Sequence, residues 1–252
     1  MQDWNPTSYL RFEAERTRPV KELAARIKCP QATMITDLGC GPGNSTAVLC
    51  KQHPKAMITG IDTSPAMLEK ARAILPGCQF EESDISRWQP EKKQDVIFAN
   101  ASLQWLTDHE TLFPHLAAQL SPQGVLAVQM PDNWHEHTHR LMREVSDEQG
   151  HSHHHRDAIL SPQMYYDILS KAGCQVDIWR TTYFHTLPST QAIIDWLSTT
   201  GLRRFINHLA PEQQGAYLDR YHELLKQHYP EQSDSNIIMP FPRLFIIARK
   251  SL

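Results

Sequence analysis

The sequence has few glycines, few cysteines, no excess of positive charge and no long apolar run. Its 252 residues include only 10 Gly and 5 Cys, and 25 Lys and Arg against 28 Asp and Glu give a formal charge of −3. The chain therefore lacks the basic excess that drives binding to nucleic-acid phosphates. No apolar run approaches the roughly 18 residues of a membrane span, and the first residues lack the basic and apolar regions of a signal peptide. We expect a cytoplasmic protein that binds neither nucleic acid nor membrane.

The cysteines are odd in number, form no C-x-x-C pair and lie in apolar segments. They are Cys29, Cys40, Cys50, Cys78 and Cys174. This pattern is typical of reduced, packed side chains, and it does not fit a disulfide framework or a zinc site. Histidine is frequent, with seven of 14 residues between His135 and His155. Because no acid stands at helical spacing to complete a metal site there, we predict a surface loop and no bound metal.

Three of the ten glycines fall within five residues, at Gly39, Gly41 and Gly43. Glycine alone reaches positive φ freely and lets a ligand approach the main chain, so the cluster indicates a functional turn. Residues 34–38 before it are short, β-branched and bounded by polar residues, which predicts a buried strand. Residues 44–46 after it offer N-cap side chains for a helix that must end before Pro54. The predicted unit is strand, glycine turn, helix.

The same alternation of strands and helices continues along the chain. Strands are predicted over residues 34–38, 56–62, 78–82, 95–100, 125–130, 175–183 and 244–248. A turn is expected at 121–124, and residues 189–238 read as mostly helical. The pattern consists of five alternating units, followed by two strands around a helical insertion. It predicts an α/β fold: a Rossmann-like, doubly wound, mostly parallel seven-stranded sheet with a helical cap. A closed (β/α)8 barrel is disfavoured because the strict alternation breaks.

Polar side chains end three of the predicted strands. Asp62, Asp84 and Asn100 follow the second, third and fourth strands, and the ligand of an open parallel sheet binds outside such carboxyl ends. Asp62 lies 19 residues past Gly43, close to the roughly 20-residue spacing at which an acid accepts hydrogen bonds from ribose hydroxyls. Asp84 is placed to accept from an adenine amino group, and it is equally compatible with a helix N-cap or a solvated loop acid.

The spacing of the glycines helps to choose the nucleotide. The run is G-x-G-x-G followed by Asn44, whereas dinucleotide sites prefer G-x-G-x-x-G. Asp37, two residues before the first glycine, would repel a pyrophosphate and suits a cationic ligand. S-adenosylmethionine fits, because it carries an ammonium group and a sulfonium centre and no phosphate. A nicotinamide oxidoreductase would share Asp62 and the glycine turn, but it is disfavoured by Asp37, by this spacing and by the lack of a Tyr-x-x-x-Lys pair.

Several segments resemble class I S-adenosylmethionine-dependent methyltransferases. Residues 35–44 and 60–67 are similar to the first two motifs of that family, and the match extends through 83–85 and 98–101. Further similarity runs from end to end of the chain, over residues 3–6, 9–10, 16–19, 100–106, 128–134 and 241–245. The resemblance implies an O-methyltransferase that esterifies a carboxylate of a small polycarboxylic acid, with trans-aconitate the expected acceptor. The products would be the monomethyl ester and S-adenosylhomocysteine.

The resemblance also implies which residues bind the cofactor. The loop from Asp37 to Gly43 would approach the methionine part, Asp62 would hold the ribose, and Asn100 with Ala101 would sit under the sulfonium, facing the acceptor. The region around Met67 would line the adenine, and residues 84–85 would meet its amino edge. The implied set is Asp37, Gly39, Gly41, Gly43, Asn44, Asp62, Thr63, Met67, Asp84, Ile85, Asn100 and Ala101.

An acceptor with three carboxylates needs cationic clamps, for which Arg is the best planar partner. The Arg candidates are Arg16, Arg18, Arg140, Arg143, Arg203 and Arg204. Aromatic residues could wall the site or equally be plain core. The preferred substrate set is Trp4, Tyr9, Arg18, Trp105, Trp134 and Arg203. Because the unperturbed pKa of a carboxyl is about 4, the acceptor is already anionic, and no catalytic base is predicted.

We expect a single, monomeric methyltransferase domain over residues 1–252. Its predicted parts are an N-terminal lid at 1–30, a cofactor-binding core at 31–131, a helical segment at 132–173, the last sheet strands at 174–187 and 241–252, and a helical cap insertion at 188–240. Two alternatives stay open. The acceptor could be another small acid, an amine or a hydroxyl, or the chain could be a non-catalytic module that keeps the cofactor site only as structure.

Overall fold

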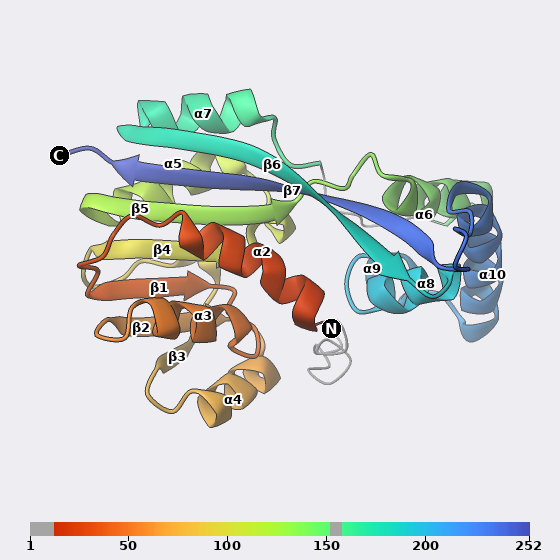
Figure 1. Cartoon of the computed structure of the whole chain (residues 1–252), viewed down its shortest axis with the longest axis horizontal. Helices are drawn as coiled ribbons and strands as arrows, with labels where there is room; N and C mark the ends of the chain where they lie inside the picture. The colour runs from red at the N-terminus through yellow and green to blue at the C-terminus, as the bar shows by residue number, and fades with distance from the viewer. Residues whose placement is uncertain (1–12, 152–157) are drawn as a thin grey trace. The chain divides into compact units, whose positions relative to one another are not determined.

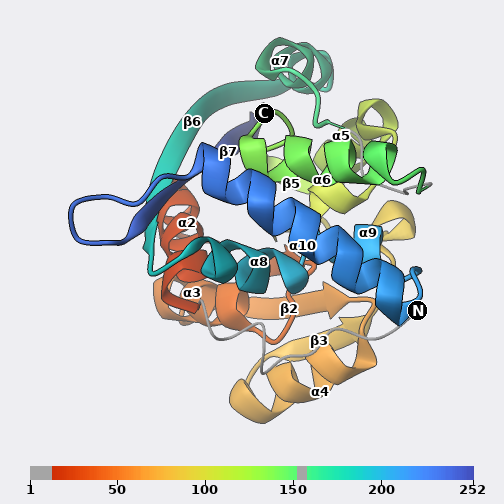
Figure 2. The ribbon, with the colours of Figure 1, turned by 90° about the vertical axis from the view of Figure 1, so that its right-hand side faces the viewer.

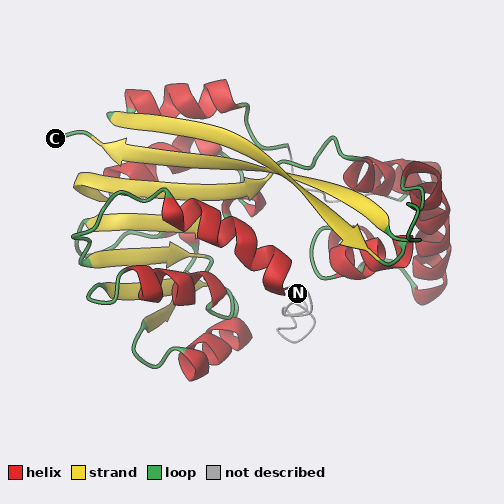
Figure 3. Cartoon of the chain, in the orientation of Figure 1, coloured by secondary structure: helices red, strands yellow, loops and turns green. Residues whose placement is uncertain are grey.

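The computed structural model describes residues 13–151 and 158–252, and these residues form a seven-stranded sheet (Figure 1). The strands are β1 (Met34–Leu38), β2 (Met57–Asp62), β3 (Gln79–Glu82), β4 (Gln94–Asn100), β5 (Leu120–Pro131), β6 (Cys174–Leu187) and β7 (Ile237–Lys250). Their order in the sheet is β3-β2-β1-β4-β5-β7-β6. Strands β1 to β5 pair in parallel, and β7 runs opposite to its neighbours (Figure 3). The predicted fold class is confirmed.

The chain forms two compact units. Unit 1 consists of the described residues up to Met130 together with Ile159–Arg180 and Leu244–Leu252, and unit 2 consists of the described residues from Pro131 to Ala158 together with Thr181–Arg243. Strands β6 and β7 therefore contribute residues to both units. The domain boundaries predicted from sequence stay predictions, because compactness alone does not show which segments fold or move together.

Helices cover both faces of the sheet in unit 1. Helices α2 (Glu13–Ala25) and α3 (Asn44–Gln52) pack together on one face, and α5 (His109–Ala118) and α7 (Pro162–Lys171) pack together on the other (Figures 1 and 2). Helix α4 (Pro65–Ile74) follows β2 and contacts β3. This arrangement leaves the carboxyl ends of the parallel strands to carry the loops that follow them.

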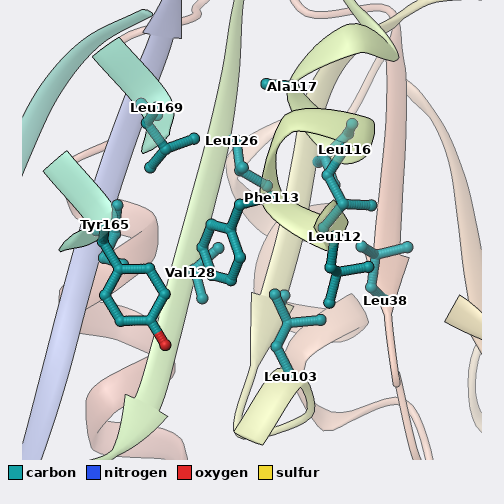
Figure 4. Close-up of a cluster of buried hydrophobic side chains, with 14 of the residues drawn as sticks. Leu38, Leu103, Leu112, Phe113, Leu116, Ala117, Leu126, Val128, Tyr165 and Leu169 are labelled. Atoms are coloured by element: carbon teal, nitrogen blue, oxygen red, sulfur yellow. The ribbon is translucent and has the colours of Figure 1, made fainter. Parts of the chain in front are cut away.

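The main hydrophobic core of unit 1 lies between the sheet and helices α5 and α7 (Figure 4). The Phe113 ring of α5 packs 4.8 Å from the Tyr165 ring of α7, measured between centroids. His109 Nδ1 lies 2.6 Å from the Tyr165 hydroxyl oxygen, and its Nε2 lies 2.9 Å from the carbonyl oxygen of Leu103. Leu103 begins the short helix η2 (Leu103–Trp105), so this contact ties the segment after β4 to the core.

Unit 2 is mainly helical. Its helices are α6 (His137–Glu148), α8 (Thr190–Ser198), α9 (Arg203–Ile206) and α10 (Pro211–His228). Helix α10 packs against both α6 and α8 (Figure 2). The fully buried hydroxyls of Tyr217 and Tyr221 donate to the carbonyls of Met142 at 2.6 Å and Thr138 at 2.9 Å. These two hydrogen bonds fasten α10 to α6. Within the described ranges, no helix is both long and apolar enough to cross a membrane.

Three strands, β5, β6 and β7, extend well beyond their predicted bounds. Strand β5 begins at Leu120, where a turn was predicted over 121–124, because its first residues pair with β4 across an irregularity of register. Strands β6 and β7 are longer than the predicted 175–183 and 244–248. In β7 the prediction stopped short because Pro240 and Pro242 are unusual inside a strand, yet both lie within it.

Candidate functional site

The loop after β1 is a left-handed turn that depends on glycine. Gly39, Gly41 and Gly43 have φ values of 72°, 53° and 95°. A Cβ at Gly39 would lie 2.4 Å from the Cβ of Ser102, which no other residue type can tolerate. A Cβ at Gly41 would meet no atom of the described residues within 4 Å. The loop is therefore tight against the chain at Gly39 and open to a ligand at Gly41.

Asp62 holds this loop from the end of β2. Its Oδ2 accepts a hydrogen bond from the backbone N–H of Gly41 at 2.9 Å, and its Oδ1 accepts from the N–H of Ser64 at 2.9 Å. These two contacts place the carboxylate beside the glycine loop. The Ser64 hydroxyl then caps α4 by accepting from the N–H of Met67, whose side chain is buried. Thr63 is exposed at the same edge.

Asp37 is fully buried at the end of β1. Burial raises the pKa of its carboxyl to about 6, although hydroxyls of Ser45 and Thr46 oppose the shift by donating to Oδ2 at 2.7 Å each. Its Oδ1 is buried and has no hydrogen-bond partner among the described residues. A buried carboxylate oxygen without a donor is suited to an external cation or N–H group.

Helix α3 begins differently from the prediction. Side chains of residues 44–46 were expected to cap it, but the N-cap is Gly43, which is in the left-handed conformation. The Ser45 and Thr46 hydroxyls point instead to Asp37. Asn44 is the first residue of the helix. The interpretation of these residues as caps was wrong, because a buried carboxylate competes for the same hydroxyls.

Asp84 caps the short helix η1 (Ile85–Arg87). Its Oδ1 accepts from the Ser86 N–H at 2.9 Å and from the Ser86 hydroxyl at 2.8 Å, and these bonds lower the pKa of Asp84. Of the three roles left open by the sequence, the structure shows the N-cap. Asp84 is exposed and Ile85 is buried, and their contact with an adenine edge stays a prediction.

The turn after β4 brings further polar groups to the carboxyl edge of the sheet. Asn100 Oδ1 is buried with no hydrogen-bond partner in the described part of the chain. Ala101 has a φ of 53°, which is rare for a residue with a Cβ. The Ser102 hydroxyl donates to the carbonyl of Leu38 at 2.7 Å, and the side-chain amide of Gln104 donates to the carbonyl of Ala101 at 2.8 Å.

Sequence reasoning missed Ser102 and Gln104. The turn-forming residues that follow the strand signal a loop, but no sequence pattern reports the conformation of Ala101 or the carbonyl that each side chain reaches. Arg243, in the segment 241–245 that carries part of the resemblance, is buried, and its guanidinium lies 4.7 Å from the centroid of the Phe241 ring.

The predicted substrate residues are distributed over both units. Trp4 and Tyr9 lie outside the described residues. Arg18 is exposed on α2 and Trp105 is half-buried at the end of η2, both in unit 1. Trp134 and Arg203, both in unit 2, complete the set.

Two other predictions concern residues of unit 2, namely Arg143 and the histidine run. The Arg143 guanidinium lies 3.9 Å from the centroid of the Trp134 ring and donates to the Trp134 carbonyl at 3.0 Å. Of the histidine run at 151–155, only His151 is described. Over residues 13–151 and 158–252, no group of three or more His, Cys, Asp or Glu side chains is placed to hold a metal ion.

Comparisons with known proteins identify close relatives. Residues 35–124 match the family model described as "Methyltransferase domain". The chain is 59% identical over 251 residues to the trans-aconitate 2-methyltransferase of Escherichia coli O157:H7 (strain EC4115), and 58% identical to that of Shigella flexneri; each alignment covers 100% of both chains.

Solved structures with low sequence identity share the fold. The YcgJ protein of Bacillus subtilis has a TM-score of 0.61 at 12% identity, with 95% of this chain and 99% of that chain covered. A Haemonchus contortus phosphoethanolamine N-methyltransferase 2, solved with S-adenosyl-L-methionine, has a TM-score of 0.59 at 14% identity, with 98% and 56% covered. At these identities the likeness establishes the fold alone.

Proposed function

The chain belongs to the trans-aconitate 2-methyltransferase family, as its 59% identity over the full length of those relatives shows, and on this premise we propose that it transfers the methyl group of S-adenosylmethionine to a carboxylate of trans-aconitate. The products are the monomethyl ester and S-adenosylhomocysteine. The single observation that supports trans-aconitate as the substrate is the sequence identity over the full length of both chains. The fold does not identify the substrate, because a phosphoethanolamine N-methyltransferase shares it.

The residues of unit 1 fit this cofactor. The backbone at Gly41 is open to a ligand, Asp37 Oδ1 is a buried acceptor without a donor in the described part of the chain, and the Asp62 carboxylate lies beside the glycine loop, where it accepts from the N–H of Gly41. We assign the ammonium group to Asp37 and the ribose hydroxyls to Asp62. The rest of the set, namely Gly39, Gly43, Asn44, Thr63, Met67, Asp84, Ile85, Asn100 and Ala101, would line the methionine and adenine parts.

The chain does not need a general base for this reaction. When bound, the cofactor would supply a methyl group on a sulfonium centre. A carboxylate oxygen would attack the methyl carbon in line, and the sulfur would leave with S-adenosylhomocysteine. The unperturbed pKa of a carboxyl is about 4, so the acceptor is anionic at neutral pH without help from the protein. The task of Asn100, Ala101 and their neighbours is to align the acceptor at attack distance and to exclude water.

For the acceptor we propose the residues with matching chemistry. A tricarboxylate requires guanidinium and hydrogen-bonding partners, and the proposed contacts are Trp4, Tyr9, Arg18, Trp105, Trp134 and Arg203. Trp105 has the strongest support, because it stands in the same turn as Asn100 and Ala101. We further propose that the enzyme acts in the cytoplasm as a monomer.

A competition assay tests the function. The protein is incubated with S-adenosylmethionine and an equimolar mixture of trans-aconitate, cis-aconitate, citrate, isocitrate and succinate, and the products are separated by liquid chromatography and mass spectrometry. We expect the mass of one added methylene first and predominantly on trans-aconitate, with matching release of S-adenosylhomocysteine. Esterification of another acid at a higher rate would overturn the substrate. Absence of S-adenosylhomocysteine binding in calorimetry would overturn the whole activity.

A further inference from the structure

We propose that Gln104 is a positioning residue for methyl transfer, which acts by holding the peptide of Ala101 in its left-handed conformation. The inference rests on the proposed function, since it concerns the turn that faces the donor and acceptor. Gln104 lies in the segment 100–106 that carries part of the resemblance, but the resemblance gives it no role.

The conformation of Ala101 has to be maintained by its surroundings. Its φ of 53° brings the Cβ close to the backbone and is unfavourable for a residue other than glycine. Such strain persists only where neighbouring groups fix the backbone, and it gathers at functional sites. Here it lies between Asn100 and Ser102, at the carboxyl end of β4 beside the glycine loop.

Hydrogen bonds hold Ala101 from two sides. Its N–H donates to the carbonyl of Gln129 on β5 at 2.9 Å, and its carbonyl accepts from Nε2 of Gln104 at 2.8 Å. The first is a backbone contact that substitution cannot remove. The second comes from a side chain, so Gln104 is the contact through which the strained peptide can be released without altering the sheet.

Gln104 is itself rigidly placed. Only 4% of its surface is exposed, and the residue before it, Leu103, is fully buried and held through its carbonyl by the ring of His109. His109 in turn meets the Tyr165 hydroxyl between α5 and α7. The amide of Gln104 is thus anchored to the core of unit 1, which makes it an effective brace.

The other end of the amide argues against a purely packing role. Gln104 Oε1 is buried and finds no hydrogen-bond partner in residues 13–151 and 158–252. An unpartnered buried acceptor is unfavourable, and an apolar side chain of the same length would avoid the cost. Retention of an amide at this position is explained if its Nε2 donor serves the turn.

The test combines removal of the brace with removal of the strain. Gln104→Met keeps the length of the side chain and loses the donor, and Ala101→Gly lets residue 101 adopt positive φ at little cost. We expect Gln104→Met to lower kcat about tenfold, because Ala101 would leave its unfavourable conformation in most molecules once the hydrogen bond from Gln104 is lost. The KM for trans-aconitate should change less. Added to that variant, Ala101→Gly should restore kcat to within about threefold of Ala101→Gly alone.

Gln119→Met is the matched control, because Gln119 is another buried glutamine of unit 1 whose amide donates to a backbone carbonyl, that of His115 at 3.3 Å. It should leave kcat unchanged. Equal loss in both Gln→Met variants, or no recovery in the double variant, would overturn the proposal. If Gln104→Met does not fold, Gln104→Glu, which preserves shape and cannot donate when ionised, replaces it.

The wild-type assay separates this inference from the proposed function. Transfer to trans-aconitate by the wild type with no effect of Gln104→Met would refute only the role of Gln104. If the wild type transfers to none of the acids, the dissociation constant of S-adenosylhomocysteine is read instead. The inference then requires weaker binding in Gln104→Met and recovery in the double variant, and a constant value in all variants would refute it.

Discussion

Buried polar groups differ between two places in the molecule. At the carboxyl edge of the sheet in unit 1, the oxygens Oδ1 of Asp37, Oδ1 of Asn100 and Oε1 of Gln104 are buried without a donor in the described residues. Between α6 and α10 in unit 2, the buried hydroxyls of Tyr217 and Tyr221 donate to backbone carbonyls, although other buried polar atoms of unit 2 also lack a partner in the described residues. Because an unmet buried acceptor costs about 1–3 kcal/mol, the three oxygens of unit 1 lower stability unless a ligand supplies donors, whereas the two tyrosine hydrogen bonds stabilise the α6–α10 contact.

The largest effect is expected at Asp62. Asp62→Ala would remove the carboxylate that we propose binds the ribose, and it would release the glycine loop; a hydrogen bond to a charged group contributes about 1.5–3 kcal/mol. We expect S-adenosylhomocysteine to bind about 100-fold more weakly in titration calorimetry.

Asp95→Ala is the control for Asp62→Ala. Asp95 lies at the opposite end of the sheet and likewise accepts from backbone N–H groups, those of Thr33 at 2.8 Å and Met34 at 3.1 Å. Its loss should lower the free energy of unfolding and spare the affinity. Affinity loss in both variants would remove the distinction between the edge and the remainder of unit 1.

The next effect is a pH dependence of binding that originates at Asp37. In the free protein its pKa is raised to about 6 by burial, and a bound ammonium group favours the ionised carboxylate and so lowers the pKa. Above a pH of about 6 the carboxylate is already ionised, and the affinity for S-adenosylhomocysteine does not depend on pH. Below that pH the ammonium group must displace a proton from Asp37, and the affinity falls by up to about tenfold per pH unit.

Calorimetry in buffers of different ionisation enthalpy measures the proton released from Asp37. Asp37→Asn should abolish both the proton release and the slope of affinity against pH, while lowering affinity at neutral pH. A slope that survives in Asp37→Asn would assign the titration to another group.

A smaller effect, and of a different kind, is expected in unit 2. Tyr221→Phe leaves the carbonyl of Thr138 without its donor and should lower the free energy of unfolding by about 1 kcal/mol in urea titrations. The affinity for S-adenosylhomocysteine should stay as in the wild type. A change in affinity without loss of stability would show that the α6–α10 interface also serves the ligand.

The smallest effect is expected at Cys50 on α3. Its Sγ lies 3.0 Å from Sγ of Cys78, and burial raises the pKa of Cys50 to about 12, so the thiol is neutral at physiological pH. Cys50→Ser exchanges one small neutral group for another and should change the unfolding free energy by less than about 0.5 kcal/mol, like most changes away from special features. If Cys50→Ser lost affinity for S-adenosylhomocysteine, the result would show that the α3 region around Cys50 contributes to cofactor binding.

The features that the sequence predicts well are those set by local pattern. Residues 34–38 form β1 within the predicted bounds, because a short segment with β-branched residues between polar residues favours a buried strand. Asp37, Asp62, Asp84 and Asn100 lie at or just after strand ends, as expected from the alternation of strands and helices.

The features that escape prediction depend on contacts between distant segments. The hydroxyls of Ser45 and Thr46 could have capped α3, and only the burial of Asp37 decides otherwise. The strain at Ala101 and the bracing amide of Gln104 arise from three-dimensional placement. The acceptor contacts stay predictions, because Arg and Trp side chains occur equally well at the surface or in the core and have no fixed spacing that indicates a binding role.

The order of strands has a consequence for synthesis of the chain. Strand β6 is at the edge of the sheet and its neighbour is β7, which begins at Ile237, after α8, α9 and α10. While the ribosome makes those helices, β6 has no partner, and the side of β5 that β7 will cover is also open. Unpaired strand edges promote association between chains. The nascent protein should therefore be most prone to aggregation, and most dependent on chaperones, during the interval between the completion of Leu187 and the arrival of β7.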